Sequence, residues 1–166
     1  MFTKYLLIFL ISMVPLIELR GAIPIAAAWG LMPTDNLLKI VIVYGICIVG
    51  NMLPVPIIYL FARKFLEWGQ DKKFIGGICS FFLVKGGNAG KKLQKKAGRG
   101  LFIALLLFVG IPLPGTGAWT GTLAASLLDM NFKETTAAVM CGVLLAGIIM
   151  LLASLGVLGG VGALIS

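Results

Sequence analysis

Long apolar stretches alternate with short polar turns along this chain, and one long polar segment separates the two halves of the pattern. The apolar stretches cover residues 5–31, 37–62, 101–128 and 135–166. A helix needs about 20 consecutive apolar residues to cross a bilayer, so each stretch is long enough to do so. The pattern therefore predicts an all-α integral membrane protein.

The first and third stretches contain residues that interrupt helices. A proline inside a helix costs about 3 kcal/mol and a glycine about 1 kcal/mol relative to alanine. In the first stretch, Pro15 and Pro24 bracket residues 18–21, and in the third, residues 110–117 include five glycines and prolines. The residues expected at the two breaks are Pro15, Gly21, Pro24, Pro112, Pro114, Gly115 and Gly117.

A broken stretch can form two half-helices that enter the membrane and return. A half-helix of about 12 residues rises about 18 Å, which reaches the middle of a hydrocarbon core about 30 Å thick. We therefore predict re-entrant helical hairpins over residues 5–31 and 101–128, with two kinked spanning helices as the alternative. Residues 37–62 and 135–160 are expected to be transmembrane helices, the former kinked near Pro54 and Pro56.

The polar segment, residues 63–99, carries the whole net charge of the protein. Its basic residues are Arg63, Lys64, Lys72, Lys73, Lys85, Lys91, Lys92, Lys95, Lys96 and Arg99. Only Glu67 and Asp71 oppose them, so the segment has the same net charge of +8 as the whole chain. Basic loops stay in the cytoplasm and attract anionic lipids. We expect a cytoplasmic linker, with an interfacial helix within residues 74–84, and no nucleic-acid binding.

The two halves of the chain, residues 1–62 and 100–166, share an order of features. With a shift of 97 residues, Pro15 and Leu16 align with Pro112 and Leu113, and in each half a broken apolar stretch is followed by a short polar turn and a long apolar stretch. If each half is one hairpin plus one spanning helix, the second hairpin enters from the opposite side. The halves would then be inverted repeats, as in many transporters.

Glu18 and Arg20 are the ionisable residues that lie deep within an apolar stretch. Charges inside a membrane are costly and are usually paired or functional. Glu18 is the carboxylate available for proton coupling, and Arg20 can bind a phosphate or a carboxylate through its guanidinium. The alternative is that both side chains bond to each other or to free backbone groups and only hold the tip of the hairpin.

The second break offers polar groups without charge. Thr116 supplies a hydroxyl, and backbone N–H groups at the start of a half-helix attract anions. Trp119 is expected to stack on a solute, with an anchor at the membrane interface as the alternative. Asn51 is a candidate hydrogen-bonding group at the centre, with a helix–helix contact as the alternative.

The composition argues against an enzyme. The chain has no histidine, and its three cysteines are far apart in the sequence, so we expect no metal site and no cofactor. Neither a nucleophile–base set nor a phosphate-binding loop with a lysine is present.

Two segments resemble a known family. VPLIELRGAIPIA at residues 14–26 and IPLPGTGAWTGTLAA at residues 111–125 are similar to the two signatures of the small multidrug export protein family of bacteria and archaea, which is itself similar to the DedA/VTT superfamily. The resemblance implies paired re-entrant hairpins and either drug export or the return of polyprenyl-phosphate lipid carriers. The residues it nominates are Glu18, Arg20, Gly21, Pro24, Pro112, Pro114, Gly115, Gly117 and Trp119.

These observations favour a small transporter in the plasma (inner) membrane that exports small amphipathic compounds, with proton coupling through Glu18. A flippase for a polyprenyl-phosphate-type lipid and a membrane assembly factor that transports nothing are the alternatives. About four membrane elements barely enclose a polar path, so we also expect a homo-oligomer.

Overall fold

The computed structural model describes residues 2–69, 71, 76–81, 84 and 100–165, and this part of the chain is helical between short turns. The helices are α1 (Phe2–Met13), α2 (Glu18–Ala28), α3 (Leu37–Met52), α4 (Pro54–Gly69), α5 (Gly76–Phe81), α7 (Gly100–Gly110), α8 (Ala118–Leu127) and α9 (Phe132–Ile165). The prediction of an all-α protein is confirmed for these residues.

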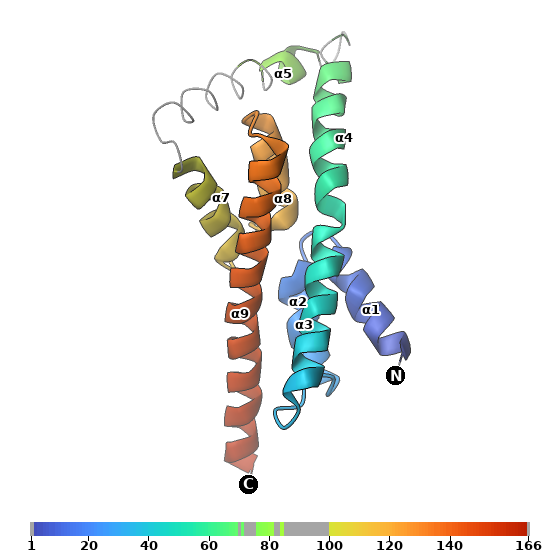
Figure 1. Ribbon diagram of the computed structural model, residues 1–166, viewed down its shortest axis with the longest axis vertical. Helices are drawn as coiled ribbons and strands as arrows, with labels where there is room; N and C mark the ends of the chain where they lie inside the picture. The colour runs from blue at the N-terminus through green and yellow to red at the C-terminus, as the bar shows by residue number, and fades with distance from the viewer. Residues whose placement is uncertain (1, 70, 72–75, 82–83, 85–99, 166) are drawn as a thin grey trace.

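Two long rods form the axis of the molecule (Figure 1). In one rod α3 and α4 follow each other from the lower to the upper end, and in the other α9 returns beside them to the C-terminus. The first helix pair, α1 and α2, flanks the lower half, whereas the second helix pair, α7 and α8, flanks the upper half. The turn inside each pair therefore lies near mid-height.

Both rods are long and apolar enough to cross a membrane, over residues Leu37–Ala62 and Phe132–Gly156. The expected kink appears as a one-residue interruption at Leu53, between α3 and α4. Leu53 keeps helical angles, and its N–H donates to the carbonyl of Val49 at 3.0 Å. Pro54 has no N–H to continue the ladder, which explains why the interruption falls there.

The break in the first pair lies earlier than the sequence indicated. We expected residues 18–21 at the tip, but the turn covers residues 14–17 and Glu18 already begins α2. Pro24 lies inside α2, where it removes one N–H without ending the helix. The chain reverses instead through Leu16 and Glu18, whose φ angles are 72° and 51°. In the second pair the turn covers residues 111–117, where glycine and proline predicted it.

The second helix of each pair ends in the same way. The N–H groups of Leu31 and Met130 each donate to a carbonyl five residues earlier, at 3.0 Å in both cases. The residues before them, Gly30 and Asp129, have φ angles of 70° and 55°. This arrangement is the Schellman motif, which uses a left-handed residue to close a helix. The two halves thus share local geometry as well as the order of their elements.

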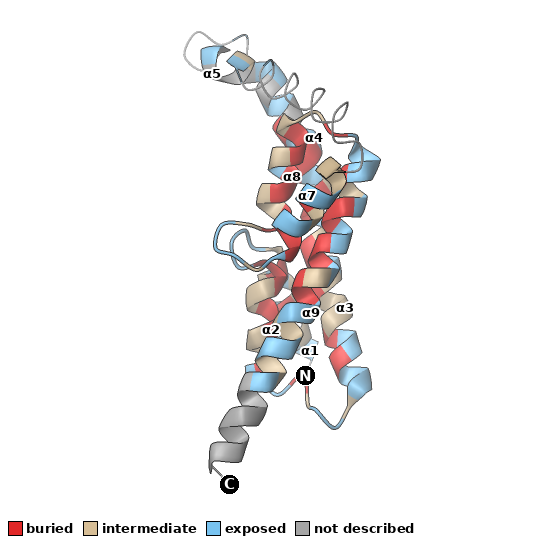
Figure 2. Ribbon diagram, turned by 90° about the vertical axis from the view of Figure 1, so that its left-hand side faces the viewer, coloured by how far each residue is buried: buried red, intermediate tan, exposed pale blue. Residues whose placement is uncertain are grey.

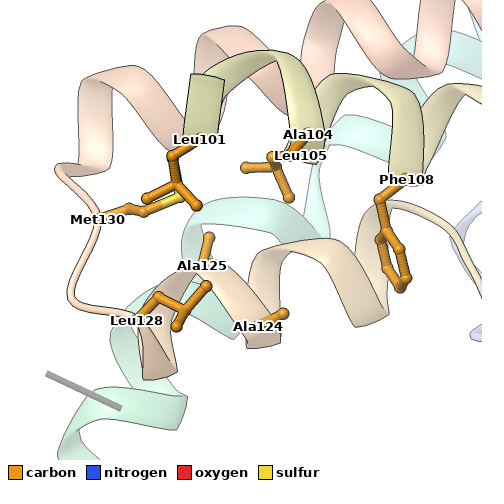
Figure 3. Close-up of a pocket in the computed structure, with 8 residues that line it drawn as sticks. All are labelled: Leu101, Ala104, Leu105, Phe108, Ala124, Ala125, Leu128 and Met130. Carbon is orange, nitrogen blue, oxygen red and sulfur yellow. The ribbon is translucent and has the colours of Figure 1, made fainter. Parts of the chain in front are cut away.

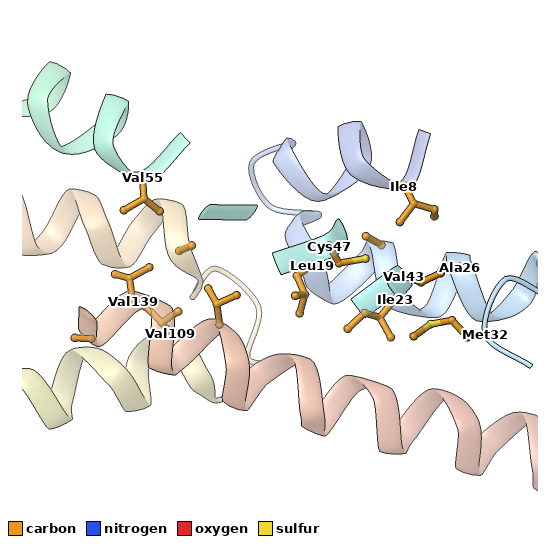
Figure 4. Packing of buried hydrophobic residues seen from close by; sticks show 14 of the residues in the cluster. Ile8, Leu19, Ile23, Ala26, Met32, Val43, Cys47, Val55, Val109 and Val139 are labelled. Carbon is orange, nitrogen blue, oxygen red and sulfur yellow. The ribbon is translucent and has the colours of Figure 1, made fainter. Parts of the chain in front are cut away.

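Buried hydrophobic side chains fill the space between the rods and the helix pairs. Figure 4 shows Val55, Val109 and Val139 gathered where α4, α7 and α9 meet, and Leu19 near Cys47 where α2 approaches α3. Figure 2 shows the buried residues along the interior and exposed ones along the outer faces. Many of those outer residues are large and apolar. An apolar outer surface of this extent fits a lipid environment.

Glycines let the rods and the helix pairs approach closely. A Cβ atom added at Gly142 in α9 would lie 2.7 Å from the Cβ atom of Val109 and 2.8 Å from the carbonyl oxygen of Leu106. A Cβ atom at Gly156, also in α9, would meet nothing within 4 Å. Small residues at such contacts are typical of helix packing in membranes.

We therefore expect Gly142→Ala to destabilise the contact between α7 and α9, by about 1–3 kcal/mol, as overpacking in well-packed cores does. Gly156→Ala is the matched control, because it adds the same methyl group to the same helix in open space. Thermal unfolding of both variants in detergent, followed by circular dichroism, measures the difference. Equal midpoints for the two variants would contradict the packing described here.

Candidate functional site

Arg20 of α2 binds the end of α7 and the turn that follows it. Its Nη1 donates to the carbonyl oxygens of Leu113 and Thr116, both at 2.7 Å, and to the Thr116 hydroxyl at 2.9 Å. Its Nη2 donates to the carbonyl oxygens of Val109 at 2.7 Å and Ile111 at 3.2 Å. A guanidinium presents its donors in a fixed planar fork, so one side chain of the first pair organises most of the turn in the second.

Glu18 of α2 binds the beginning of α8. Its Oε2 accepts from the N–H of Ala118 at 3.1 Å, and its Oε1 accepts from the N–H of Trp119 at 3.0 Å. Glu18 is 4% exposed. Its two oxygens therefore accept hydrogen bonds from N–H groups in the first turn of α8, which have no partner within that helix.

A third bond runs in the opposite direction. The indole Nε1 of Trp119 donates to the carbonyl oxygen of Met13, the last residue of α1, at 3.2 Å. Each helix pair thus supplies side chains that bond to the backbone ends of the other pair. We call this set of bonds between Glu18, Arg20 and Trp119 and the opposite pair the cross-pair bonds.

The signs of the charges match the helix ends that they bind. The free carbonyls at a helix C-terminus carry partial negative charge, and the free N–H groups at an N-terminus carry partial positive charge. Arg20 lies at the end of α7 and Glu18 at the beginning of α8. An unpaired backbone group in apolar surroundings costs free energy, and the cross-pair bonds supply partners for such groups at the ends of α7 and α8. In one alternative drawn from the sequence, Glu18 and Arg20 bond to free backbone groups at the tip of their own hairpin. They do bond to free backbone groups, but those groups belong to the other helix pair.

Gly117 lets Glu18 reach α8. An added Cβ atom at Gly117 would lie 2.6 Å from Oε1 and 2.7 Å from Cδ of Glu18. Gly117 also has φ 153° and ψ −172°, a conformation essentially restricted to glycine. Position 117 therefore requires glycine both for its backbone angles and for the space that the carboxylate occupies.

A small recess opens beside the carboxylate of Glu18, with a volume of about 170 Å³. We call it the Glu18 recess. The residues that line it are Pro15, Leu16, Glu18, Gly115, Thr116, Trp119, Thr120 and Leu123. Both turns contribute to its walls, so the recess exists only because the two pairs meet.

A larger apolar groove lies between α4 and α8, with a volume of about 440 Å³. We call it the α4–α8 groove, and it is lined by Ile58, Phe61, Ala62, Phe65, Trp119, Leu123 and Leu127. A further recess of about 200 Å³ between α7 and α8 is entirely apolar (Figure 3). That recess offers no polar group to orient a ligand, whereas the α4–α8 groove adjoins Glu18 through shared residues.

The other predicted residues lie at varying distances from this centre. Asn51 is 2% exposed near the end of α3, and its Oδ1 has no hydrogen-bond partner. Gly21 lies within α2, where an added Cβ atom would meet the side chain of Ile17. Pro112 and Pro114 lie in the turn that Arg20 binds. Among the described residues, no three His, Cys, Asp or Glu side chains gather where they could hold a metal ion.

Two residues that line the Glu18 recess escaped the sequence analysis. Thr120 and Leu123 carry no charge and lie in an unremarkable helical segment, so composition did not mark them. The spacing of Trp119, Leu123 and Leu127 is the signal that could have done so, because residues four apart share one face of a helix. Most of the basic linker lies outside the described residues, including its lysines from Lys72 to Lys96. Within residues 74–84, where the sequence predicts an interfacial helix, the structure describes the helix α5.

Replacement of Gly117 by alanine is expected to weaken the bonds of Glu18 to α8. Gly117→Ala both strains the backbone and occupies the position of the carboxylate, whereas Gly115→Ala, at φ 80° with nothing within 4 Å, only strains the backbone. Strain alone costs about 1–2 kcal/mol, and hydrogen bonds to a charged group contribute about 1.5–3 kcal/mol each. Thermal unfolding in nanodiscs should therefore show a clearly larger loss for Gly117→Ala. Equal losses would mean that the carboxylate does not depend on this close approach.

Comparison with known proteins identifies the family. Residues 18–149 match the family described as "Putative small multi-drug export protein". Searches of curated proteins and of solved structures found no match, and the similarity to DedA/VTT proteins stays a prediction. The matched range begins at Glu18 and covers most of the chain. It includes Glu18, Arg20 and Trp119, the three residues whose side chains form the cross-pair bonds. With two helices apolar enough to cross a bilayer, the match indicates a membrane protein, and the chain belongs to the small multi-drug export protein family.

Proposed function

We propose that this protein is a transporter that exports small amphipathic compounds, and that Glu18 couples export to protons. The observation that carries the proposal is a buried carboxylate at the junction of two helix pairs, beside a recess that both pairs line. Ionisable residues inside a membrane are costly and usually mark a transport pathway or a proton relay. The family name points to the same class of activity.

In this proposal the two helix pairs are re-entrant hairpins that enter the membrane from opposite sides. Their helices have 12, 11, 11 and 10 residues, so each rises about 15–18 Å, half of a hydrocarbon core about 30 Å thick. The shared Schellman motifs support an internal repeat. The opposite directions of the two pairs along the rods (Figure 1) support an inverted one.

The proposed orientation follows from the linker. Its basic residues favour the cytoplasmic side of the plasma (inner) membrane, which places the upper end of Figure 1 in the cytoplasm. Both chain ends lie toward the lower end of that figure and would then face outward. Anionic lipids at the linker and a homo-oligomer remain part of the proposal, since a single copy surrounds the Glu18 recess only partly.

Protonation of Glu18 is the coupling step of this proposal. In the structure, each carboxylate oxygen accepts one N–H group of α8. A proton on either oxygen removes the negative charge of the carboxylate, so the bonds that it accepts from the two N–H groups lose their charge assistance and weaken. The tie between α2 and α8 is then weakened, and the two hairpins can separate on one side of the membrane. Loss of the proton restores both bonds and closes the junction.

The geometry favours export over the lipid-flippase alternative. A phosphate headgroup would need Arg20, but the guanidinium already donates to four carbonyl oxygens and one hydroxyl of the second pair. Binding a phosphate there would break the bonds that organise the turn. The third alternative, an assembly factor, also uses the cross-pair bonds, and it is distinguished from a transporter by measured transport.

Reconstitution in liposomes tests the proposal. Uptake of cationic, neutral and anionic amphipathic compounds is followed with an imposed proton gradient, alongside proton flux reported by an internal dye. We expect the gradient to drive at least one class of compound and Glu18→Gln to slow that uptake at least about tenfold, which equals about 1.4 kcal/mol in the barrier. Asp35→Asn, at an exposed carboxylate in the turn before α3, should transport at the wild-type rate.

Two results would count against the proposal. Uptake no faster than in empty liposomes for every class would support the assembly factor, and full activity of Glu18→Gln would remove proton coupling at this residue. Size-exclusion profiles and circular dichroism of each variant show whether the protein still folds.

A further inference from the structure

The Glu18 recess and the α4–α8 groove are adjacent parts of one site. Trp119 and Leu123 line both of them. These residues lie one turn apart on the same face of α8, and Leu127 extends that face along the groove. A molecule that lies in the groove therefore has one end next to the carboxylate.

The two parts offer different chemistry. The lining of the groove is apolar and includes the rings of Phe61, Phe65 and Trp119. Glu18 is the one ionisable residue among those that line the recess. Arg20 does not line it, and its donors are directed at the second helix pair. The combined site therefore presents an apolar, aromatic body and a single negative end.

Glu18 keeps the capacity to bind a ligand cation. Each of its oxygens accepts one N–H group, from Ala118 and Trp119, and a carboxylate oxygen has two lone-pair positions. One position on each oxygen therefore stays free of these two donors, and Glu18 is one of the residues that line the recess. The indole of Trp119 is held by its bond to Met13, so it forms a fixed wall that also attracts cations through its ring face.

We propose that the substrates are amphipathic cations with a flat apolar or aromatic body, which lies in the α4–α8 groove while the cationic head binds Glu18. The inference rests on the proposed transport function and names the class of substrate. The groove volume of about 440 Å³ falls in the usual range of small-molecule sites, about 300–1,000 Å³. Phe61 on its rim is 67% exposed, so the groove opens on the outer face, where an amphipathic molecule enters from the lipid.

The same arrangement disfavours anionic ligands. An anion in the groove would place its negative head against Glu18, and like charges in a site of low dielectric repel strongly. Arg20 lies near the recess, but its donors already bind the second helix pair, and none of the residues that line the recess or the groove is cationic. A neutral molecule would gain only the apolar contacts. A membrane lipid tail can occupy an apolar groove, but its occupancy would not depend on the charge of residue 18.

Binding of matched fluorescent probes tests the substrate class without requiring transport. Pyrenemethylammonium, pyrenemethanol and pyreneacetate share one aromatic body and differ in the charge of the head. The protein carries Trp29→Phe and Trp68→Phe in nanodiscs, so that Trp119 is the remaining tryptophan, and energy transfer from Trp119 to pyrene reports occupancy beside it. Empty nanodiscs with the same lipids give the background.

We expect the cation to bind at least about tenfold more tightly than the alcohol or the anion. Glu18→Gln should raise the Kd of the cation at least about tenfold and leave the Kd of the alcohol within about twofold. Leu123→Trp, which fills the junction of recess and groove without changing a cross-pair bond, should raise the Kd of the cation as well. Because that variant adds a tryptophan, its Kd is obtained by displacement of tritiated pyrenemethylammonium, and Leu152→Trp, at a position of α9 that is 67% exposed, is its matched control.

Equal binding of the three probes, or a Kd for the cation that Glu18→Gln does not change, would overturn the inference. Loss of binding in Leu152→Trp would also overturn it, because the site would then lie elsewhere. The proposed function can survive that failure: liposome uptake of a neutral or anionic compound that depends on Glu18 would keep the transporter and remove the cationic substrate. Binding of the cation without liposome uptake of any compound would keep the cationic ligand and remove the transport function.

Discussion

Backbone groups in the middle of an apolar structure need partners, and the architecture of this protein depends on how they obtain them. The chain reverses twice near mid-height (Figure 1), and each reversal leaves helix ends with backbone groups that the helices themselves do not bond. Arg20 binds the end of α7, Glu18 binds the beginning of α8, and Trp119 binds the end of α1. Neither turn is complete without the other pair.

This mutual dependence links stability to the candidate site. The carboxylate that binds α8 also lines the recess, and Trp119, whose indole binds α1, lines both the recess and the α4–α8 groove. A change in the charge of Glu18 therefore alters both the wall of the recess and the contact between the pairs. A transporter needs such a link, because its ligand and its coupling ion must bias the same two-state element.

Local chemistry explains which features could be predicted. The second turn falls where glycine and proline are concentrated, and the rod through α3 and α4 is interrupted where Pro54 removes an N–H. The first turn lies four residues earlier than expected, because Leu16 and Glu18 adopt left-handed angles that residue type does not favour, while α2 tolerates Pro24. Contacts across the molecule stabilise those angles, and local preferences do not reveal them.

The sequence by itself determined the all-helical class, the apolar segments, the approximate breaks and the choice of Glu18 and Arg20 as candidate residues, because all of these follow from composition and short-range spacing. Only the tertiary structure decided that these two side chains diverge toward different helices about 90–100 residues away in the chain. It also decided that Thr120 and Leu123 join the site. Such contacts depend on which helix ends lie close together in space, and that proximity results from packing of the whole chain.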